Sequence, residues 1–192
     1  MNNFIGSVVL FFVLSISFAQ EKEDEKKLFF GLKAGFNVSS VSNIEKASSK
    51  VSYHIGGFAE FSIADRFSLQ PEIVYSCQGV DVSNGTYNFN YVNIPIMAKF
   101  YATPSLSFEA GPQIGFLVEA KAKPTVGGSY DVKEFFKTND IGVNFGASYD
   151  VDKNIDITLR YNLGLSQLQK ELEVGEKAAK NSAFQLSVGY RF

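Results

Sequence analysis

From Leu28 to the C-terminus, apolar and polar residues alternate along the chain with a period of two. The segment before the C-terminus shows it most clearly, because one face of an extended chain there carries Phe184, Leu186, Val188, Tyr190 and Phe192. Such alternation indicates β-strands with two chemically different faces. The pattern predicts eight strands, over residues 28–37, 52–63, 67–78, 90–101, 106–118, 140–150, 155–166 and 182–192.

The connections between these segments alternate between short and long. Short turns are expected at 64–66, 102–105 and 151–154, and long polar segments at 38–51, 79–89, 119–139 and 167–181. Outer-membrane barrels pair short periplasmic turns with long extracellular loops, and strands of about ten residues cross their apolar band. The sequence therefore predicts an all-β fold, an eight-stranded antiparallel up-and-down transmembrane β-barrel of the outer-membrane type.

The two faces differ in charge and in glycine content. We expect the polar, glycine-rich face to line the lumen, because glycine suits a crowded, curved interior and an exposed strand face favours larger residues. A soluble barrel, the alternative, would turn this face outward. Aromatic residues of the apolar face near the short turns and the C-terminus predict a periplasmic girdle: Phe61, Phe67, Phe100, Phe108, Tyr149, Tyr190 and Phe192.

The charged residues of the polar face form the candidate site. An eight-stranded barrel is just wide enough inside for side chains, and unpaired buried charge is costly, so we expect these residues to pair across the lumen and plug it. The alternative is a selective pore. The predicted lumen charge network comprises Lys33, Glu60, Glu72, Lys99, Glu109, Arg160 and Arg191.

The N-terminus predicts export. Residues 1–19 form an uncharged apolar run that ends with small residues at Ser17 and Ala19, so we interpret them as a signal peptide cleaved before Gln20. A retained membrane anchor is the alternative, although the run is short for a span. Residues 20–27 predict a flexible lead-in, and residues 28–192 the barrel, located in the outer membrane of the cell.

Composition and isolated residues offer little evidence for chemistry. The net charge of −2 gives no basis for nucleic-acid binding, and the sequence predicts no metal and no cofactor. Cys77 is the only cysteine and is interpreted as an apolar filler. The only histidine, His54, has Ser52 close by in sequence. A general base needs a nucleophile within hydrogen-bond reach and an orienting carboxylate, and neither follows from the sequence. We therefore predict that the protein is not an enzyme.

Seven segments together resemble the porin-like or PorT-like outer-membrane β-barrel domain family of Bacteroidota. They cover nearly all of the predicted barrel in order: 31–37, 69–79, 91–100, 108–118, 140–150, 159–165 and 184–192. The C-terminal residues Phe184, Leu186, Val188, Tyr190 and Phe192 also resemble the signal that the outer-membrane insertion machinery recognises. The resemblance implies an eight-stranded barrel in the outer membrane, and it implies no common activity.

Three functions remain open at this point. The first is a structural or interaction barrel, for adhesion or surface contact, that binds an extracellular ligand through the loops 38–51, 79–89, 119–139 and 167–181. The second is a narrow porin-like channel or a membrane component of a secretion or gliding apparatus. The third is a lipid-modifying enzyme centred on His54. The partners expected in every case are outer-membrane lipid and the insertion machinery, with no nucleic acid, and we expect a monomer.

Overall fold

The computed structural model describes residues 28–43, 47–171 and 177–192. The predicted signal peptide (1–19) and lead-in (20–27) lie outside the described residues, as do parts of two predicted loops. Within the described residues, no helix has the length and apolar character needed to cross a membrane.

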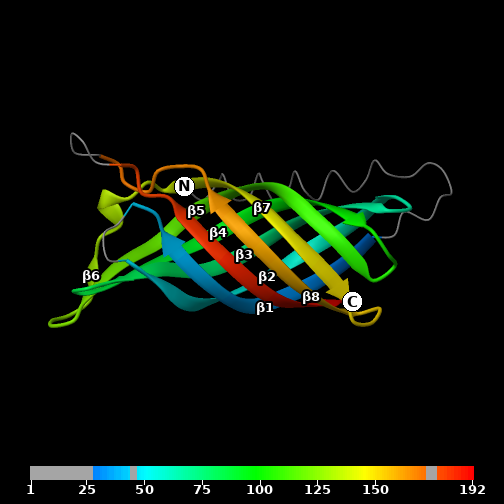
Figure 1. Ribbon diagram of the computed structural model, residues 1–192, viewed down its shortest axis with the longest axis horizontal. Coiled ribbons are helices and arrows are strands. Elements are labelled where there is room, and N and C mark those ends of the chain that lie inside the picture. Colours follow the sequence, from blue (N-terminus) through cyan, green and yellow to red (C-terminus); the bar gives the residue numbers. More distant parts are fainter. Residues whose placement is uncertain (1–27, 44–46, 172–176) are drawn as a thin grey trace, which may run out of the picture.

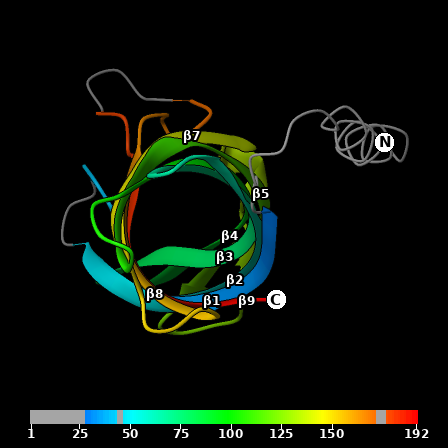
Figure 2. The same ribbon diagram turned by 90° about the vertical axis from the view of Figure 1, so that its right-hand side faces the viewer.

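The described residues form a closed antiparallel ring. Its order is β1-β2-β3-β4-β5-β7-β8-β9, and β9 pairs back with β1. Figure 2 shows the ring end-on, and Figure 1 shows its tilted strands from the side. The elements are β1 (Leu28–Val41), β2 (Ser48–Ala64), β3 (Phe67–Val82), β4 (Gly85–Tyr101), β5 (Leu106–Pro124), β6 (Tyr130–Asp131), η2 (Lys133–Phe135), β7 (Asn139–Asp150), β8 (Ile155–Gly164) and β9 (Asn181–Arg191). The predicted fold, an eight-stranded barrel, is confirmed, and the short β6 is an addition at the edge of β5.

The barrel is polar inside and apolar outside over most of its height. Glu72 is 2% exposed, whereas Leu159 and Val188 are 57% and 55% exposed. Glycines of the inner face allow neighbouring backbones and side chains to come close: a Cβ on Gly31 would lie 2.3 Å from the ring of Phe58. The polar face is therefore the lumen face, as predicted, and the apolar face is the one that contacts lipid.

The three short turns lie at one end of the barrel, at the right of Figure 1, together with Leu28 and Phe192. Side chains fix two of them, because Thr103 Oγ1 accepts a hydrogen bond from the backbone of Leu106 at 3.0 Å and Asp152 Oδ1 accepts one from the backbone of Ile155 at 2.8 Å. Such side-chain bonds satisfy backbone donors that no strand partner reaches. By the usual orientation of outer-membrane barrels, this end is periplasmic.

At the opposite end the strands are longer than predicted. Residues 79–89 are not a long loop: β3 continues to Val82, β4 begins at Gly85, and Val82 pairs with Gly85, so only Ser83 and Asn84 form the turn. The predicted loop 38–51 is likewise mostly strand, and β5 continues to Pro124. The 19 residues of β5 extend about 60 Å at the rise of a strand, far beyond the ~25 Å apolar band of such barrels even when tilted.

In these extracellular ends the polarity of the two faces is inverted. On β4, Tyr91 and Phe89 point inward and are buried, whereas Asn90 and Asn88 are outside and partly exposed. A register shift in the pairing of β4 with β5 lies at the same level, beside Asn90 and Tyr91. We call the extracellular ends of β1–β5, with residues 125–138, 165–171 and 177–180, the crown. Its inside is a small apolar core of Val41, Val80, Phe89, Tyr91, Leu117, Ala120, Leu168 and Ala179.

Candidate functional site

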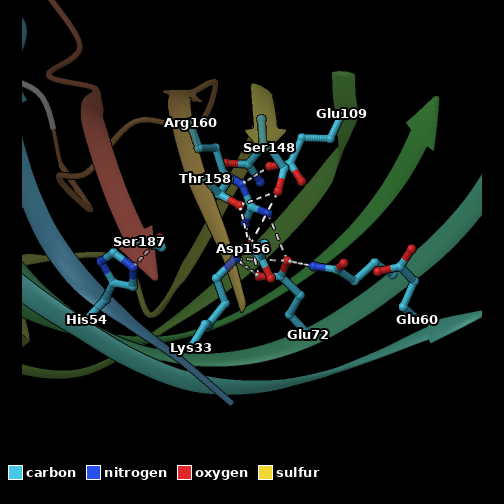
Figure 3. A network of polar contacts seen from close by, with 12 residues as sticks. Lys33, His54, Glu60, Glu72, Glu109, Ser148, Asp156, Thr158, Arg160 and Ser187 are labelled. Carbon is cyan, nitrogen blue, oxygen red and sulfur yellow. Dashed lines mark hydrogen bonds and ion pairs between the residues drawn. The ribbon is translucent and has the colours of Figure 1, made fainter. Parts of the chain in front are cut away.

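The lumen holds a charged cluster at mid-height, drawn in Figure 3. Arg160 on β8 donates two hydrogen bonds to Glu72 on β3, from Nη2 to Oε1 at 2.8 Å and from Nη1 to Oε2 at 3.0 Å. Arg160 Nε donates to Glu109 Oε1 on β5 at 2.6 Å, and Lys33 Nζ on β1 lies 3.2 Å from Glu72 Oε1. All four side chains are buried. The forked contact of the guanidinium with Glu72 fixes that carboxylate in direction as well as in distance.

A second charged cluster lies nearer the periplasmic turns. Lys99 Nζ lies 3.2 Å from Glu60 Oε2, and Arg191 Nε lies 3.8 Å from the same oxygen. Arg191 also forms a forked pair with Asp150, with Nη1 3.1 Å from Oδ2, and its Nη2 lies 3.6 Å from Asp156 Oδ1. The structure thus brings all seven predicted charged residues into the lumen.

Asp150 and Asp156 belong to this cluster and are missing from the predicted network. The signal for Asp156 is present in the sequence, since it alternates with Thr158 and Arg160 on the polar face. Asp150 is the last residue of β7 and adjoins a predicted turn, where a carboxylate is common at the surface. Only the pairing of β7 with β8, which sets Asp150 opposite Asp156, brings both near Arg191.

Gln70 joins the two charged clusters. Its Nε2 donates to Glu72 Oε1 at 2.7 Å, and its Oε1 accepts from Lys99 Nζ at 3.2 Å. Polar contacts therefore continue from mid-height to the periplasmic end of the lumen. Taking charges out of water costs more than a single ion pair returns unless further hydrogen bonds satisfy the same groups. The shared contacts supply such bonds to Glu72 and Lys99, whereas Glu109 Oε2 and Arg191 Nε are buried without a hydrogen-bond partner among the described residues. The buried side chains of the two clusters occupy the lumen over this part of its height.

Above the charged clusters lies a neutral layer around His54. Nδ1 of His54 lies 2.7 Å from Asn37 Oδ1, and Nε2 lies 2.7 Å from Ser187 Oγ. Figure 3 shows His54 and Ser187 facing each other on one side of the charged cluster. Gln185 Nε2 also donates to Asn37 Oδ1, at 3.1 Å, so the layer is a connected set of hydrogen bonds.

Ser52, the hydroxyl close to His54 in the sequence, is not its hydrogen-bond partner in the structure. Ser52 Oγ donates to the carbonyl of Cys77, and the hydroxyl at the imidazole is that of Ser187. A hydroxyl, an imidazole and an amide oxygen in series have the geometry of a nucleophile, a base and its orienting group. Yet Ser187, His54 and Asn37 are 3%, 2% and 0% exposed. A lipid cannot reach them through the wall, so the arrangement is best explained as satisfied packing of buried polar groups.

The apolar core of the crown closes the extracellular end of the lumen. Phe89 packs edge-on against Phe136, with ring centroids 4.8 Å apart, and Leu117 and Leu168 are buried beside them. Backbone hydrogen bonds hold the overlying segments in place: Leu168 N donates to Ala179 O at 2.9 Å, and Val132 N to Ala120 O at 3.0 Å. The lumen is therefore filled at three successive levels, charged, neutral and apolar.

The C-terminal residues predicted to act as an insertion signal all lie on the outside of β9 or just beyond it. Each of them is exposed: Phe184, Leu186, Val188, Tyr190 and Phe192. Of the predicted girdle, Phe67 and Phe100 are in contact at the periplasmic end, with centroids 5.1 Å apart. Cys77 is half-buried and faces the outside of β3. Among residues 28–43, 47–171 and 177–192, no cluster of histidine, cysteine and carboxylate side chains could hold a metal ion.

Known protein families and solved structures that resemble this chain have the same architecture. Residues 18–170 match the family described as Outer membrane protein beta-barrel domain. The fold is similar to that of Ail, the attachment invasion locus protein of Yersinia pestis, solved with the heparin analogue sucrose octasulfate: the TM-score is 0.53 at 16% identity, over 86% of this chain and 99% of that one. It is also similar to Neisserial surface protein A, with a TM-score of 0.54 at 16% identity, over 86% of this chain and 97% of that one. No curated protein matches the chain. The chain belongs to the outer membrane protein beta-barrel domain family, and its place is the cell outer membrane.

Proposed function

We propose that this protein is a non-conducting membrane anchor that presents its crown for contact with an extracellular partner. The observation that carries the proposal is the filled lumen. The ion pair between Arg160 and Glu72 lies at mid-height, and the apolar core around Phe89 lies at the extracellular end. Ions that crossed would have to displace a buried ion pair and then pass an apolar barrier, and both steps are costly.

The crown supports the second half of the proposal. Strands that project beyond the bilayer and enclose their own core form a firm platform, and binding residues are frequently carried by loops held on such a scaffold. Ail was solved with a heparin analogue, so a sulfated polysaccharide is a reasonable first probe for this chain. The finer resemblance to PorT-like barrels, with a role in secretion or gliding, is the alternative, and it needs a protein partner in the periplasm or the membrane.

Planar-bilayer recording with the purified protein tests the anchor. We expect no stepwise conductance from the wild-type chain, and we expect rare or no steps from a chain in which residues 125–138 are replaced by a short turn, because the charged clusters remain. Reproducible steps from the wild type would contradict the proposal. The contact role is tested by binding of proteoliposomes to immobilised heparin. The chain lacking residues 125–138 is the matched variant, and we expect it to bind less.

A further inference from the structure

The outer wall of β2–β5 has a sharp boundary between apolar and polar residues. Going toward the crown, the last apolar residues on the outside are Val51, Val92 and Val118 on β2, β4 and β5. Directly beyond them the same wall carries Lys50, Asn90 and Glu119, followed on β5 by Lys121. Such a boundary is expected at the level where the hydrocarbon of the outer leaflet ends and its headgroups begin.

A hollow of about 570 Å³ lies on this wall just above the boundary. Lys50, Lys121 and Lys123 line it, with the amides of Asn88 and Asn90. Lys50 reaches Asn88 Oδ1 by crossing β3 at Gly79, where a Cβ would lie 3.1 Å from Cδ of Lys50. The lining itself has three lysines and one carboxylate, Glu119, which pairs with Lys121. A second carboxylate, Asp131, lies opposite Lys121 in the β5–β6 ladder and outside the lining, so cations are in excess among the lining residues.

A second hollow, of about 300 Å³, lies lower on the same wall and is apolar. Its sides are Phe30, Ile73, Ile94 and Ile96, and the small residue Gly57 gives it depth. A Cβ on Gly57 would make only ordinary van der Waals contacts, the nearest at 3.5 Å with the carbonyl oxygen of Gly31. Glycine is therefore not required here by the packing of the barrel itself.

The two hollows are aligned along the strands. On β2, Tyr53 lines the upper hollow and Gly57, four residues further along, lines the lower one. On β4, Asn90 and Ile94 have the same spacing and line the upper and the lower hollow respectively. Four residues of strand correspond to about 13 Å. That spacing suits a lipid whose phosphate is at the headgroup level and whose acyl chain follows the wall toward the bilayer centre.

We propose that the two hollows bind one phosphorylated glycolipid of the outer leaflet, of the lipid A class, with its phosphates on Lys50, Lys121 and Lys123 and an acyl chain against Gly57. Charge complementarity selects this occupant. A second copy of the barrel that approached by the same wall would set lysines against lysines. A free polysaccharide has no apolar part to fill the lower hollow, which lies at hydrocarbon depth.

Native mass spectrometry of the purified barrel in detergent tests the proposal, with bis-phosphorylated lipid A and phosphatidylglycerol as probes. The triple variant Lys50→Gln, Lys121→Gln, Lys123→Gln should retain about tenfold less lipid A than the wild type, because each lysine near a lipid phosphate contributes to binding. The control variant Lys137→Gln, Lys153→Gln, Lys180→Gln removes the same charge elsewhere and should retain lipid A like the wild type. Phosphatidylglycerol, with one phosphate, should respond more weakly to the triple variant.

Gly57→Leu fills the lower hollow and should also lower lipid A retention, with Ala59→Leu as the second variant if the first fails to show heat-modifiable migration. Equal retention by the wild type and the triple variant, or an equal loss in the control variant, would overturn the proposal. A polysaccharide would be the occupant if heparin displaced lipid A from the wild type and Gly57→Leu had no effect on retention. A second copy of the barrel would be the occupant if Gly57→Leu converted a dimer in detergent to a monomer. Either result would overturn the proposal.

Discussion

Arg160 and Glu72 face each other across the full width of the barrel and are joined by two hydrogen bonds, of 2.8 and 3.0 Å. Their strands, β8 and β3, are four neighbours apart in either direction around the ring, so this pair spans its diameter. Both side chains are buried, and Glu109 and Lys33 complete the charge balance on either side. The pair ties opposite walls together, which no backbone ladder of the barrel can do.

Removal of one partner should therefore destabilise the barrel more than removal of a matched pair. We expect Glu72→Gln to lower the free energy of unfolding by about 3 kcal/mol, because it leaves the buried Lys33 and Arg160 with too few anions. The double variant Glu72→Gln, Lys33→Gln should recover part of this loss. Urea unfolding in lipid vesicles measures both, with the exposed Glu134→Gln as the control. Equal stability of the wild type and Glu72→Gln, combined with new conductance, would instead indicate a water-filled pore.

The outward face makes a depth-dependent prediction. Leu159 lies at the middle of β8 on the outside, opposite Leu186 of β9. Arginine there should cost about 2–4 kcal/mol, whereas arginine at the interfacial Phe67 should cost about 1 kcal/mol or less. Leu159→Ala controls for lost packing. Insertion yield and unfolding in vesicles provide the readout, and a larger loss at Phe67 than at Leu159 would mean that the apolar band has been placed at the wrong height.

We predict that the hydrogen-bonded layer around His54 stabilises the barrel and does not catalyse a reaction on lipid. His54→Ala leaves Asn37 and Ser187 without their shared partner, and we expect it to lower stability by about 1–3 kcal/mol, the cost of leaving buried polar groups unsatisfied. Ser187→Ala should cost less, because it removes one hydroxyl. Mass spectrometry of outer-membrane lipids from cells that carry each variant should match the wild type. A lipid species that disappears in both variants would support the enzyme hypothesis instead.

The sequence predicts the membrane part of this fold well and the crown poorly, and both outcomes have one cause. At membrane depth, period two combines with a constant polarity for each face, so residues such as Glu72 and Leu159 assign their own faces. In residues 86–91 the alternation continues but its polarity is inverted, with Tyr87, Phe89 and Tyr91 inward. Turn-forming residues such as Gly79, Asn84 and Gly85 precede this segment. Together with the inverted polarity, they make it look like a loop in the sequence.

The site residues that the sequence missed depend on register. Ser187 is 133 residues from His54, and they meet because β1 pairs with both β2 and β9, which puts Gly35 opposite His54 and Ser187 at once. No local pattern contains that information. By contrast, Lys33, Glu60 and Arg191 lie on a face that alternation identifies, although their individual partners follow only from the ring.

The crown should open without unfolding the barrel. Phe89 contacts Phe136 at 4.8 Å between centroids and belongs to the core beneath residues 125–138. Phe89→Ala should cost about 3–5 kcal/mol in the local stability of this core, as expected for a buried phenylalanine, and should release the segment that carries Lys133 and Lys137. Trypsin should then cleave intact proteoliposomes at these lysines much faster than in the wild type. The urea midpoint of the barrel should change little, because the charged clusters and the part of the ring at membrane depth lie elsewhere, and the backbone pairing of Phe89 with Gln78 and Ala120 does not depend on its side chain. Asn88→Ala, on the outside of the same strand, is the matched control and should leave the cleavage rate unchanged. If Phe89→Ala lowered the midpoint of the whole barrel and left cleavage at Lys133 and Lys137 unchanged, the crown and the barrel would be one cooperative unit and the crown could not act as a separate platform.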